Sequence, residues 1–134
     1  MQDNVTRPRL AKIFTVLMGL AFLEVILQAF LFSGFYANGN PTYIDLHGMA
    51  GELTGNILYV LILIAVFARF PRHLRVVWWT VLLAILWNVQ VWVLGHGIGD
   101  TRWFEMVHIP LAFGILLLAL YLTVKTRPHA WPNQ

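Results

Sequence analysis

The sequence predicts an all-α fold in which four helices cross a membrane as an up-and-down bundle. Of the 134 residues, 59% are hydrophobic and 11% are charged, whereas a soluble domain has about 25% charged residues. Four apolar segments each reach the length of about 20 residues that a bilayer crossing needs. We expect the helices at about 13–36, 43–68, 76–96 and 103–124. Because they occupy most of the chain, residues 1–134 are expected to form one membrane domain.

The basic residues are sorted between the connections, and this predicts the orientation of the helices. Most of them precede the first helix, join the second to the third, or follow the fourth: Arg7, Arg9, Lys12, Arg69, Arg72, Arg75, Lys125 and Arg127. Arg102 is the only cation in the other two connections. The positive-inside rule therefore puts both termini in the cytoplasm. We expect the membrane to be the inner membrane of a prokaryote. The net charge of +3 then reflects topology and does not indicate nucleic-acid binding.

The chain divides into two helical hairpins. The turn-rich segments 34–41 (GFYANGNP) and 95–101 (GHGIGDT) are expected to connect the helices of each hairpin. Pro71, in the link 69–75, is expected to stop the second helix. Gln28 precedes His47 by 19 residues and Gln90 precedes His108 by 18, which indicates a faint internal repeat of the two hairpins.

His47 and His108 are the main candidate functional residues. Each lies about one turn inside an apolar helix that is expected to start at the outer face, and ionisable side chains at membrane depth usually mark functional sites. Their matching depth predicts a shared ligand, for which a haem iron bound from both sides is the best candidate. The chain contains no cysteine, which excludes thiolate metal sites, iron–sulfur clusters and haem attached through Cys.

Small residues follow both histidines at helical spacing. Gly51 and Gly55 come four and eight residues after His47, and Ala112 comes four residues after His108. Such positions let a flat cofactor, or another helix, approach the backbone closely. In the second outer connection, His96 and Arg102 are candidates for contacts with haem propionates, and solvent-exposed positions are the alternative.

Two carboxylates, Glu24 and Glu52, also fall at membrane depth. They could relay protons during a redox step. Alternatively, protonated carboxyl groups could hydrogen-bond Gln28, Asn88 or Gln90 and hold the helices together.

The stretch VQVWVLGHG, followed by VHIPLAFGILLLALYL, resembles a hairpin of haem A synthase, and so does the first hairpin with LEVILQAFLFSG and LHGMAGEL. The resemblance implies a b-type haem site with ligands on the second and fourth helices, at His47 and His108. Short four-helix, two-histidine membrane proteins of unknown function share this outline, and the similarity to cytochrome b561-type proteins is weaker. Haem A synthase has two such halves and outer-loop cysteines, so the resemblance implies haem binding here rather than synthase activity.

The leading prediction is a membrane protein that binds haem b through His47 and His108 near the outer face and transfers electrons. One haem near one face cannot carry electrons across about 30 Å of hydrocarbon. A quinone, an external cytochrome, a second protomer or a larger redox complex is therefore expected as partner. Two alternatives stay open: an accessory subunit of a membrane complex without haem, and a carrier of copper or a small solute, for which His96, Met49 and Met106 could add ligands.

Overall fold

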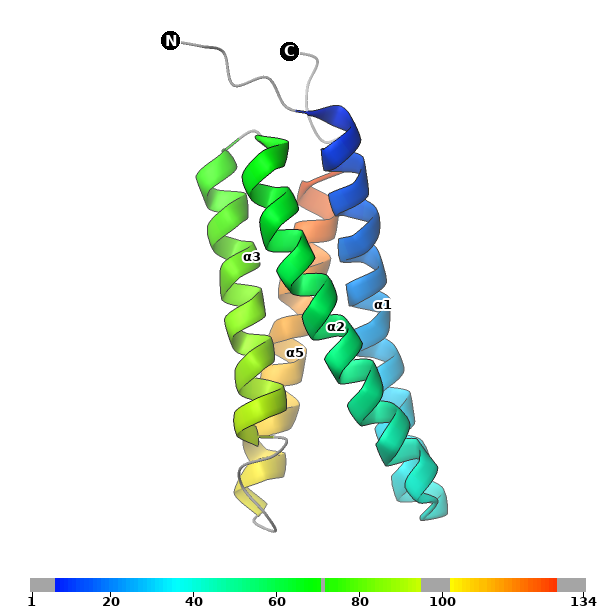
Figure 1. Ribbon diagram of the computed structural model, residues 1–134. Helices are drawn as coiled ribbons and strands as arrows, with labels where there is room; N and C mark the ends of the chain where they lie inside the picture. Colours follow the sequence, from blue (N-terminus) through cyan, green and yellow to red (C-terminus); the bar gives the residue numbers. More distant parts are fainter. Residues whose placement is uncertain (1–6, 71, 95–101, 128–134) are drawn as a thin grey trace.

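The chain folds into four long helices and, in the part that the structure describes, has no β-strand (Figure 1). This computed structural model describes residues 7–70, 72–94 and 102–127, with the backbone alone for 102–105. The helices are α1 (Pro8–Asn38), α2 (Pro41–Ala68), α3 (His73–Asn88) with the short π-helix η1 (Val89–Val93), and α5 (Arg102–Lys125). All four spans are long and apolar enough to cross a membrane. The predicted all-α fold is confirmed, with four helices of the length and composition that a membrane crossing needs.

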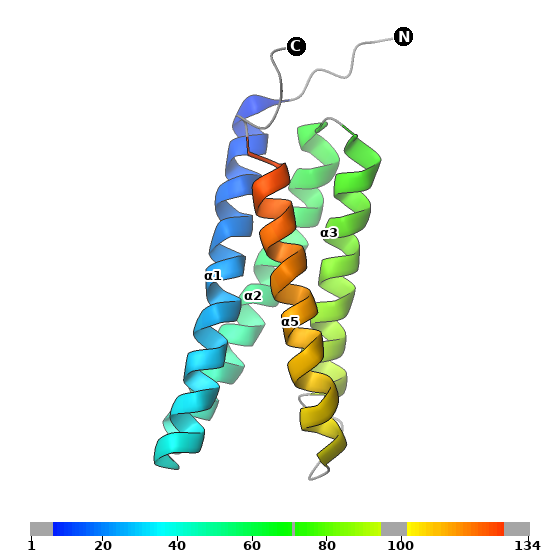
Figure 2. The same cartoon turned by 180° about the vertical axis from the view of Figure 1, so that it is seen from behind.

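The helices form a ring in which each hairpin packs against the other. α1 contacts α2 and α5, and α3 contacts the same two helices. Successive helices run in opposite directions, so α1 begins and α5 ends at the same end of the bundle (Figures 1 and 2). We call this the closed end, and the opposite end, where α1 ends and α2 begins, the open end.

Side chains of all four helices pack tightly at the closed end. The largest apolar side chains that are fully buried among the described residues are there or near the middle of the bundle: Phe14, Met18, Leu58, Leu61, Leu83, Ile115 and Leu122. Polar contacts add to this packing, since the Thr15 hydroxyl lies 2.8 Å from the Thr126 carbonyl oxygen. The Arg7 amide donates to the Ala68 carbonyl at 2.9 Å, which joins the start of α1 to the end of α2.

The two hairpins separate toward the open end (Figures 1 and 2). The Trp87 indole is buried between them, and its Nε1–H donates to the Gly51 carbonyl of α2 at 3.1 Å. A buried indole fills much space and requires a hydrogen-bond acceptor. Trp87 therefore marks the boundary between the packed core and the separated part of the bundle.

The connections differ from the sequence prediction in detail. α1 extends through most of segment 34–41 and ends at Gly39, whose φ of +63° suits glycine. Asn40 then accepts a hydrogen bond from the Thr42 amide at 3.0 Å and caps α2. At the closed end α2 ends at Ala68, and Arg69 adopts a left-handed conformation with φ of 53°. Pro71 and segment 95–101 lie outside the described residues.

Candidate functional site

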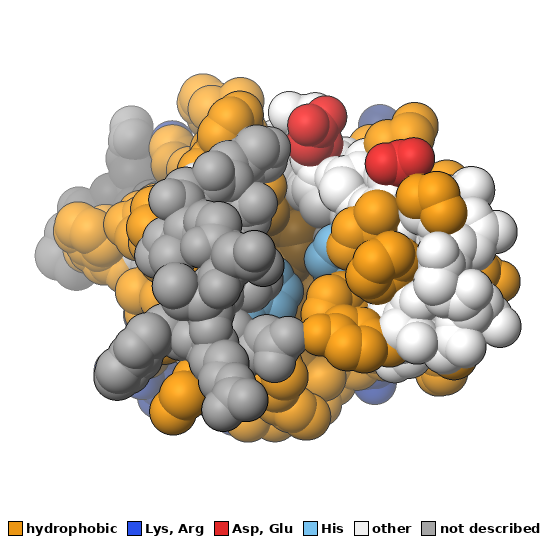
Figure 3. Space-filling model, turned by 90° about the horizontal axis from the view of Figure 1, so that it is seen from below, with side chains coloured by type: hydrophobic (Ala, Val, Ile, Leu, Met, Phe, Trp, Pro, Cys, Tyr) orange, Lys and Arg blue, Asp and Glu red, His pale blue; other side chains and the backbone are white. Residues whose placement is uncertain are grey.

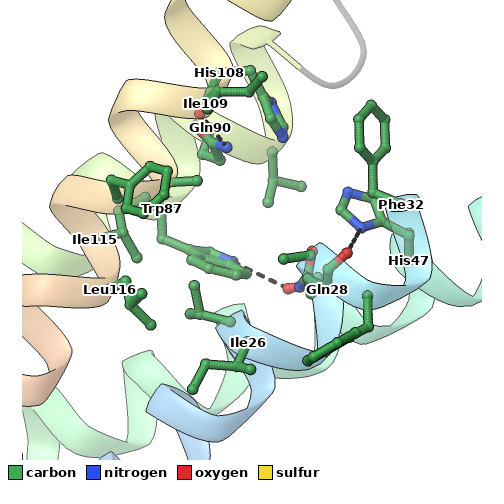
Figure 4. A pocket seen from close by; sticks show the side chains of 18 of the residues that line it. Ile26, Gln28, Phe32, His47, Trp87, Gln90, His108, Ile109, Ile115 and Leu116 are labelled. Carbon is green, nitrogen blue, oxygen red and sulfur yellow. Dashed lines mark hydrogen bonds between the residues drawn. The ribbon is translucent and has the colours of Figure 1, made fainter. Parts of the chain in front are cut away.

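A cavity of about 650 Å³ lies between the two hairpins on the open side of Trp87 (Figure 4). Residues of all four spans line it, most of them apolar. Viewed from the open end, histidine side chains lie inside a hollow between hydrophobic groups (Figure 3). Ligand cavities in proteins usually measure about 300–1,000 Å³ and combine apolar walls with a few polar groups. This cavity has the size and lining of such a site.

His47 and His108 both line this cavity, one from each hairpin. Each lies six residues after the start of its helix, Pro41 for α2 and Arg102 for α5, so the two residues have matching positions along their helices. Their ring centroids are 6.3 Å apart and the ring planes are inclined by 44°. Two imidazoles that bind one metal ion from opposite sides through bonds of about 2.0 Å have ring centroids about 6 Å apart. The observed separation matches that arrangement.

A hydrogen bond holds the ring of His47. Its Nδ1 atom lies 3.1 Å from the carbonyl oxygen of Gln28 on α1, and the second ring nitrogen faces the cavity (Figure 4). Phe32 packs on the same ring with a centroid distance of 5.8 Å. Metal-binding histidines usually donate one N–H to a carbonyl or carboxylate, which leaves the other nitrogen as the ligand. His47 has this arrangement.

Two irregularities in the helices surround His108. Pro110 lies inside α5, two residues after His108, and a proline in a helix removes one backbone hydrogen bond. Across from it, α3 continues as η1, in which the Leu94 amide bonds the Val89 carbonyl five residues back. Gln90 in this π-helix donates from Nε2 to the carbonyl oxygen of His108 at 3.0 Å. Single π turns occur frequently at functional sites, and this one lies in the cavity wall.

The two glutamines have related positions in the two hairpins. Gln28 contacts the histidine of the first hairpin through its backbone carbonyl, and Gln90 contacts that of the second through its side chain. Both line the cavity and are buried, with 9% and 5% of their surface exposed. Gln28 Nε2 and Gln90 Oε1 have no hydrogen-bond partner among the described residues. One donor and one acceptor are thus left for a ligand or water in the cavity.

The small residues predicted beside the histidines have different surroundings. Gly51 and Ala112 line the cavity. A Cβ atom at Gly51 would lie 3.5 Å from Gln28 Nε2, an ordinary contact distance. Gly55, one turn further toward the closed end, faces the Trp87 indole, also at 3.5 Å from a built Cβ. Gly51 and Ala112 therefore widen the cavity, while Gly55 accommodates Trp87.

The remaining predicted site residues are only partly described. His96 and the Arg102 side chain lie outside the described residues. Glu52 is exposed at the cavity rim, and Glu24 is half-buried, with an Oε1 atom that has no partner in the described part of the chain.

Two of the partners suggested for these carboxyl groups make other hydrogen bonds, although Gln90 Oε1 keeps its acceptor free among the described residues. Asn88 accepts from the Tyr59 hydroxyl at 2.8 Å and donates to the Ala84 carbonyl at 2.7 Å, and Gln90 Nε2 is bonded to His108.

The described residues contain no group of three or more His, Cys, Asp or Glu side chains that could hold a metal ion by themselves. Zinc and copper sites usually need three or four protein ligands. Met49 and Met106, considered as further ligands, are largely exposed. The donors on the cavity walls that the structure describes include two imidazoles, one from each hairpin.

Several of these features were not foreseen from the sequence: the bond from His47 to the Gln28 backbone, the π-helix at Gln90, and the Trp87–Gly51 bond. For the two features that involve glutamine, the sequence signal was the position of Gln28 and Gln90 before each histidine.

Comparisons with protein-family models, with curated protein sequences and with solved structures find no match to this chain. The fold and the site define the class: a four-helix bundle, long and apolar enough to span a membrane, with a cavity between its hairpins and a histidine on each side of it.

Proposed function

We propose that the protein binds one haem b in the cavity between the hairpins, with His47 and His108 as the axial ligands of the iron. The observation that carries this proposal is the 6.3 Å separation of the two imidazole centroids across the cavity. The hydrogen bond from His47 to Gln28 supports it, because it orients one ring nitrogen toward the cavity.

The cavity suits a flat, largely apolar cofactor. Its walls come from both hairpins and are mainly aliphatic and aromatic, including Ile26, Phe113 and Leu116. Gly51 and Ala112 leave room next to the two histidines. Haem b bound there would supply one-electron chemistry, and His47 and His108 together would hold the iron in a way that favours electron transfer over oxygen activation. His96 and Arg102 are proposed to contact the propionates.

The site is proposed to face the outside of a prokaryotic inner membrane. The basic residues named above as flanking the helices, from Arg7 to Arg127, all belong to segments at the closed end of the bundle. The positive-inside rule assigns that end to the cytoplasm, so the open end with its cavity faces outward. Electrons then need a partner, which is a quinone, an external cytochrome or a larger redox complex.

The test is a pyridine haemochrome spectrum of the purified protein, as expressed and after reconstitution with haem b. We expect about one haem per chain in the wild type, and loss or severe disturbance of the spectrum in His47→Ala and in His108→Ala. His73→Ala is the matched control, because His73 lies at the closed end of the bundle; its spectrum should equal that of the wild type.

Other outcomes would assign a different function. A wild-type protein without a Soret band, even after reconstitution, would overturn the proposal and favour an accessory subunit without haem. Copper without iron in metal analysis would favour the carrier. Unchanged spectra in both histidine variants would move the ligands elsewhere, with His96 as the next candidate.

A further inference from the structure

One exposed face of α2 carries polar side chains halfway along the span. Glu52, which also borders the cavity, and Asn56 are both exposed and lie close to the middle of Pro41–Ala68. Tyr59, on the same face, is 49% exposed. Polar groups at this depth are unfavourable in contact with lipid and normally face other protein.

Among the described residues, the other three long helices do not expose polar side chains of this kind near their middles. The exposed side chains near their middles are large and apolar: Leu20 and Leu23 of α1, Leu82 and Ile85 of α3, and Phe113 and Leu117 of α5. These surfaces suit contact with lipid chains. The polar face of α2 therefore distinguishes this helix from the rest of the bundle.

Contacts within the chain satisfy only part of this polar face. The Tyr59 hydroxyl donates to Asn88 Oδ1 of α3 at 2.8 Å. The side chains of Glu52 and Asn56 make no hydrogen bond to any residue of the described part. In an apolar medium, such side chains gain hydrogen bonds by associating with another helix.

The spacing of the exposed residues on this face is that of a coiled-coil seam. They alternate at intervals of three and four residues, and we call them the α2 seam: Met49, Glu52, Asn56, Tyr59, Leu63 and Val66. This is the a/d pattern of a helix that packs against another helix with a left-handed crossing. Asn56 falls on an a position near the centre, where a single asparagine sets register and oligomeric state.

We propose that the α2 seam is the contact surface between two copies of this chain, related by a two-fold axis along the membrane normal. Two copies in one membrane have parallel α2 helices, so identical residues meet at identical depth. A carboxamide carries both donors and acceptors, and a protonated carboxyl does as well. Asn56 can therefore pair with Asn56 of the second copy, with Met49 and Leu63 packing on either side. The proposal does not depend on the cofactor.

The absence of cysteine from the chain allows a direct test with single-cysteine variants in membranes. Leu63→Cys places a thiol on the seam, and Leu117→Cys on α5 is the matched control, with similar exposures of 60% and 64%. Under mild oxidation we expect a disulfide-linked dimer of the Leu63→Cys protein and at least a several-fold lower yield for Leu117→Cys. Met49→Cys should cross-link as well.

Asn56→Leu tests the role of the central asparagine. In detergent, the mass of the wild-type protein should equal that of two chains, and Asn56→Leu should shift it toward one. The same substitution in the Leu63→Cys background should reduce cross-linking several-fold, while helical circular dichroism stays unchanged. A purified wild type that is monomeric at every concentration, or equal cross-linking at positions 63 and 117, would overturn the proposal. So would an Asn56→Leu protein that dimerises as the wild type does.

Discussion

His47 Nδ1 lies 3.1 Å from the backbone carbonyl oxygen of Gln28, so the first helix of a hairpin orients the candidate ligand on the second. In the other hairpin the corresponding glutamine, Gln90, reaches the carbonyl of His108 through its side chain, at 3.0 Å. The same pair of residue types is thus connected in two ways. The bond to His108 uses the side chain of Gln90 and therefore depends on that residue being glutamine. The bond to His47 uses the backbone of Gln28 and does not depend on its side chain.

This difference predicts opposite effects of two matching substitutions. Gln90→Leu removes the hydrogen bond to His108 and should lower the free energy of unfolding by about 1 kcal/mol. Gln28→Leu keeps the backbone carbonyl that binds His47 and removes a buried amide nitrogen without a partner in the described structure, so stability should stay equal or rise. Equilibrium unfolding in detergent measures both. Equal destabilisation by the two substitutions would contradict the geometry described here.

Gly51 controls the free space beside His47. A Cβ atom there meets Gln28 Nε2 at an ordinary 3.5 Å, so Gly51→Ala should fold and retain haem. Gly51→Leu should fill part of the cavity and reduce the haem-to-protein ratio at least several-fold, measured by absorbance. Gly114→Leu is the control, because a Cβ atom at Gly114 has nothing within 4 Å. A haem ratio that Gly51→Leu leaves unchanged would place the cofactor away from this wall.

Trp87 connects the hairpins at the inner limit of the cavity. Trp87→Phe retains an aromatic ring but removes the donor to the Gly51 carbonyl, so the free energy of unfolding should fall by about 1 kcal/mol, with some further loss from the smaller ring. Trp78→Phe is a suitable control, since Trp78 is 68% exposed and should change stability little. The comparison uses thermal or denaturant unfolding in the same detergent. An equal effect of both substitutions would argue against a structural role of the indole N–H.

The proposed orientation predicts which end of the bundle reacts with a membrane-impermeant thiol reagent. Ala37→Cys, at the open end, should be labelled in intact cells. Leu74→Cys, at the closed end and 70% exposed, should be labelled only after the membrane is opened. The wild type provides the blank because it contains no cysteine. The reverse pattern would place the cavity on the cytoplasmic side.

Much of the fold could be predicted from hydropathy and segment length, because a helix must satisfy its own backbone hydrogen bonds in a membrane whatever its tertiary contacts. The helix ends were less predictable. α1 begins at Pro8 rather than near residue 13 and continues to Asn38, since polar residues at a span end remain helical and Gly39 ends the helix through its positive φ. The matching positions of His47 and His108 along their helices also followed from the sequence, because they depend only on where the two helices begin.

The sequence by itself determined four apolar helices, a chain without thiols, and two histidines at matching positions in their helices, because these follow from the composition and order of residues along single segments. Only the tertiary structure decided that both imidazoles face one cavity, 6.3 Å apart, and that Gln28 and Gln90 contact them. The direction of a side chain depends on how each helix is rotated and tilted against its neighbours. Here three features set that rotation and tilt: the packing at the closed end, the Trp87 side chain between the hairpins, and the π-helix at Gln90. None of these can be read from the spacing of residues within one helix.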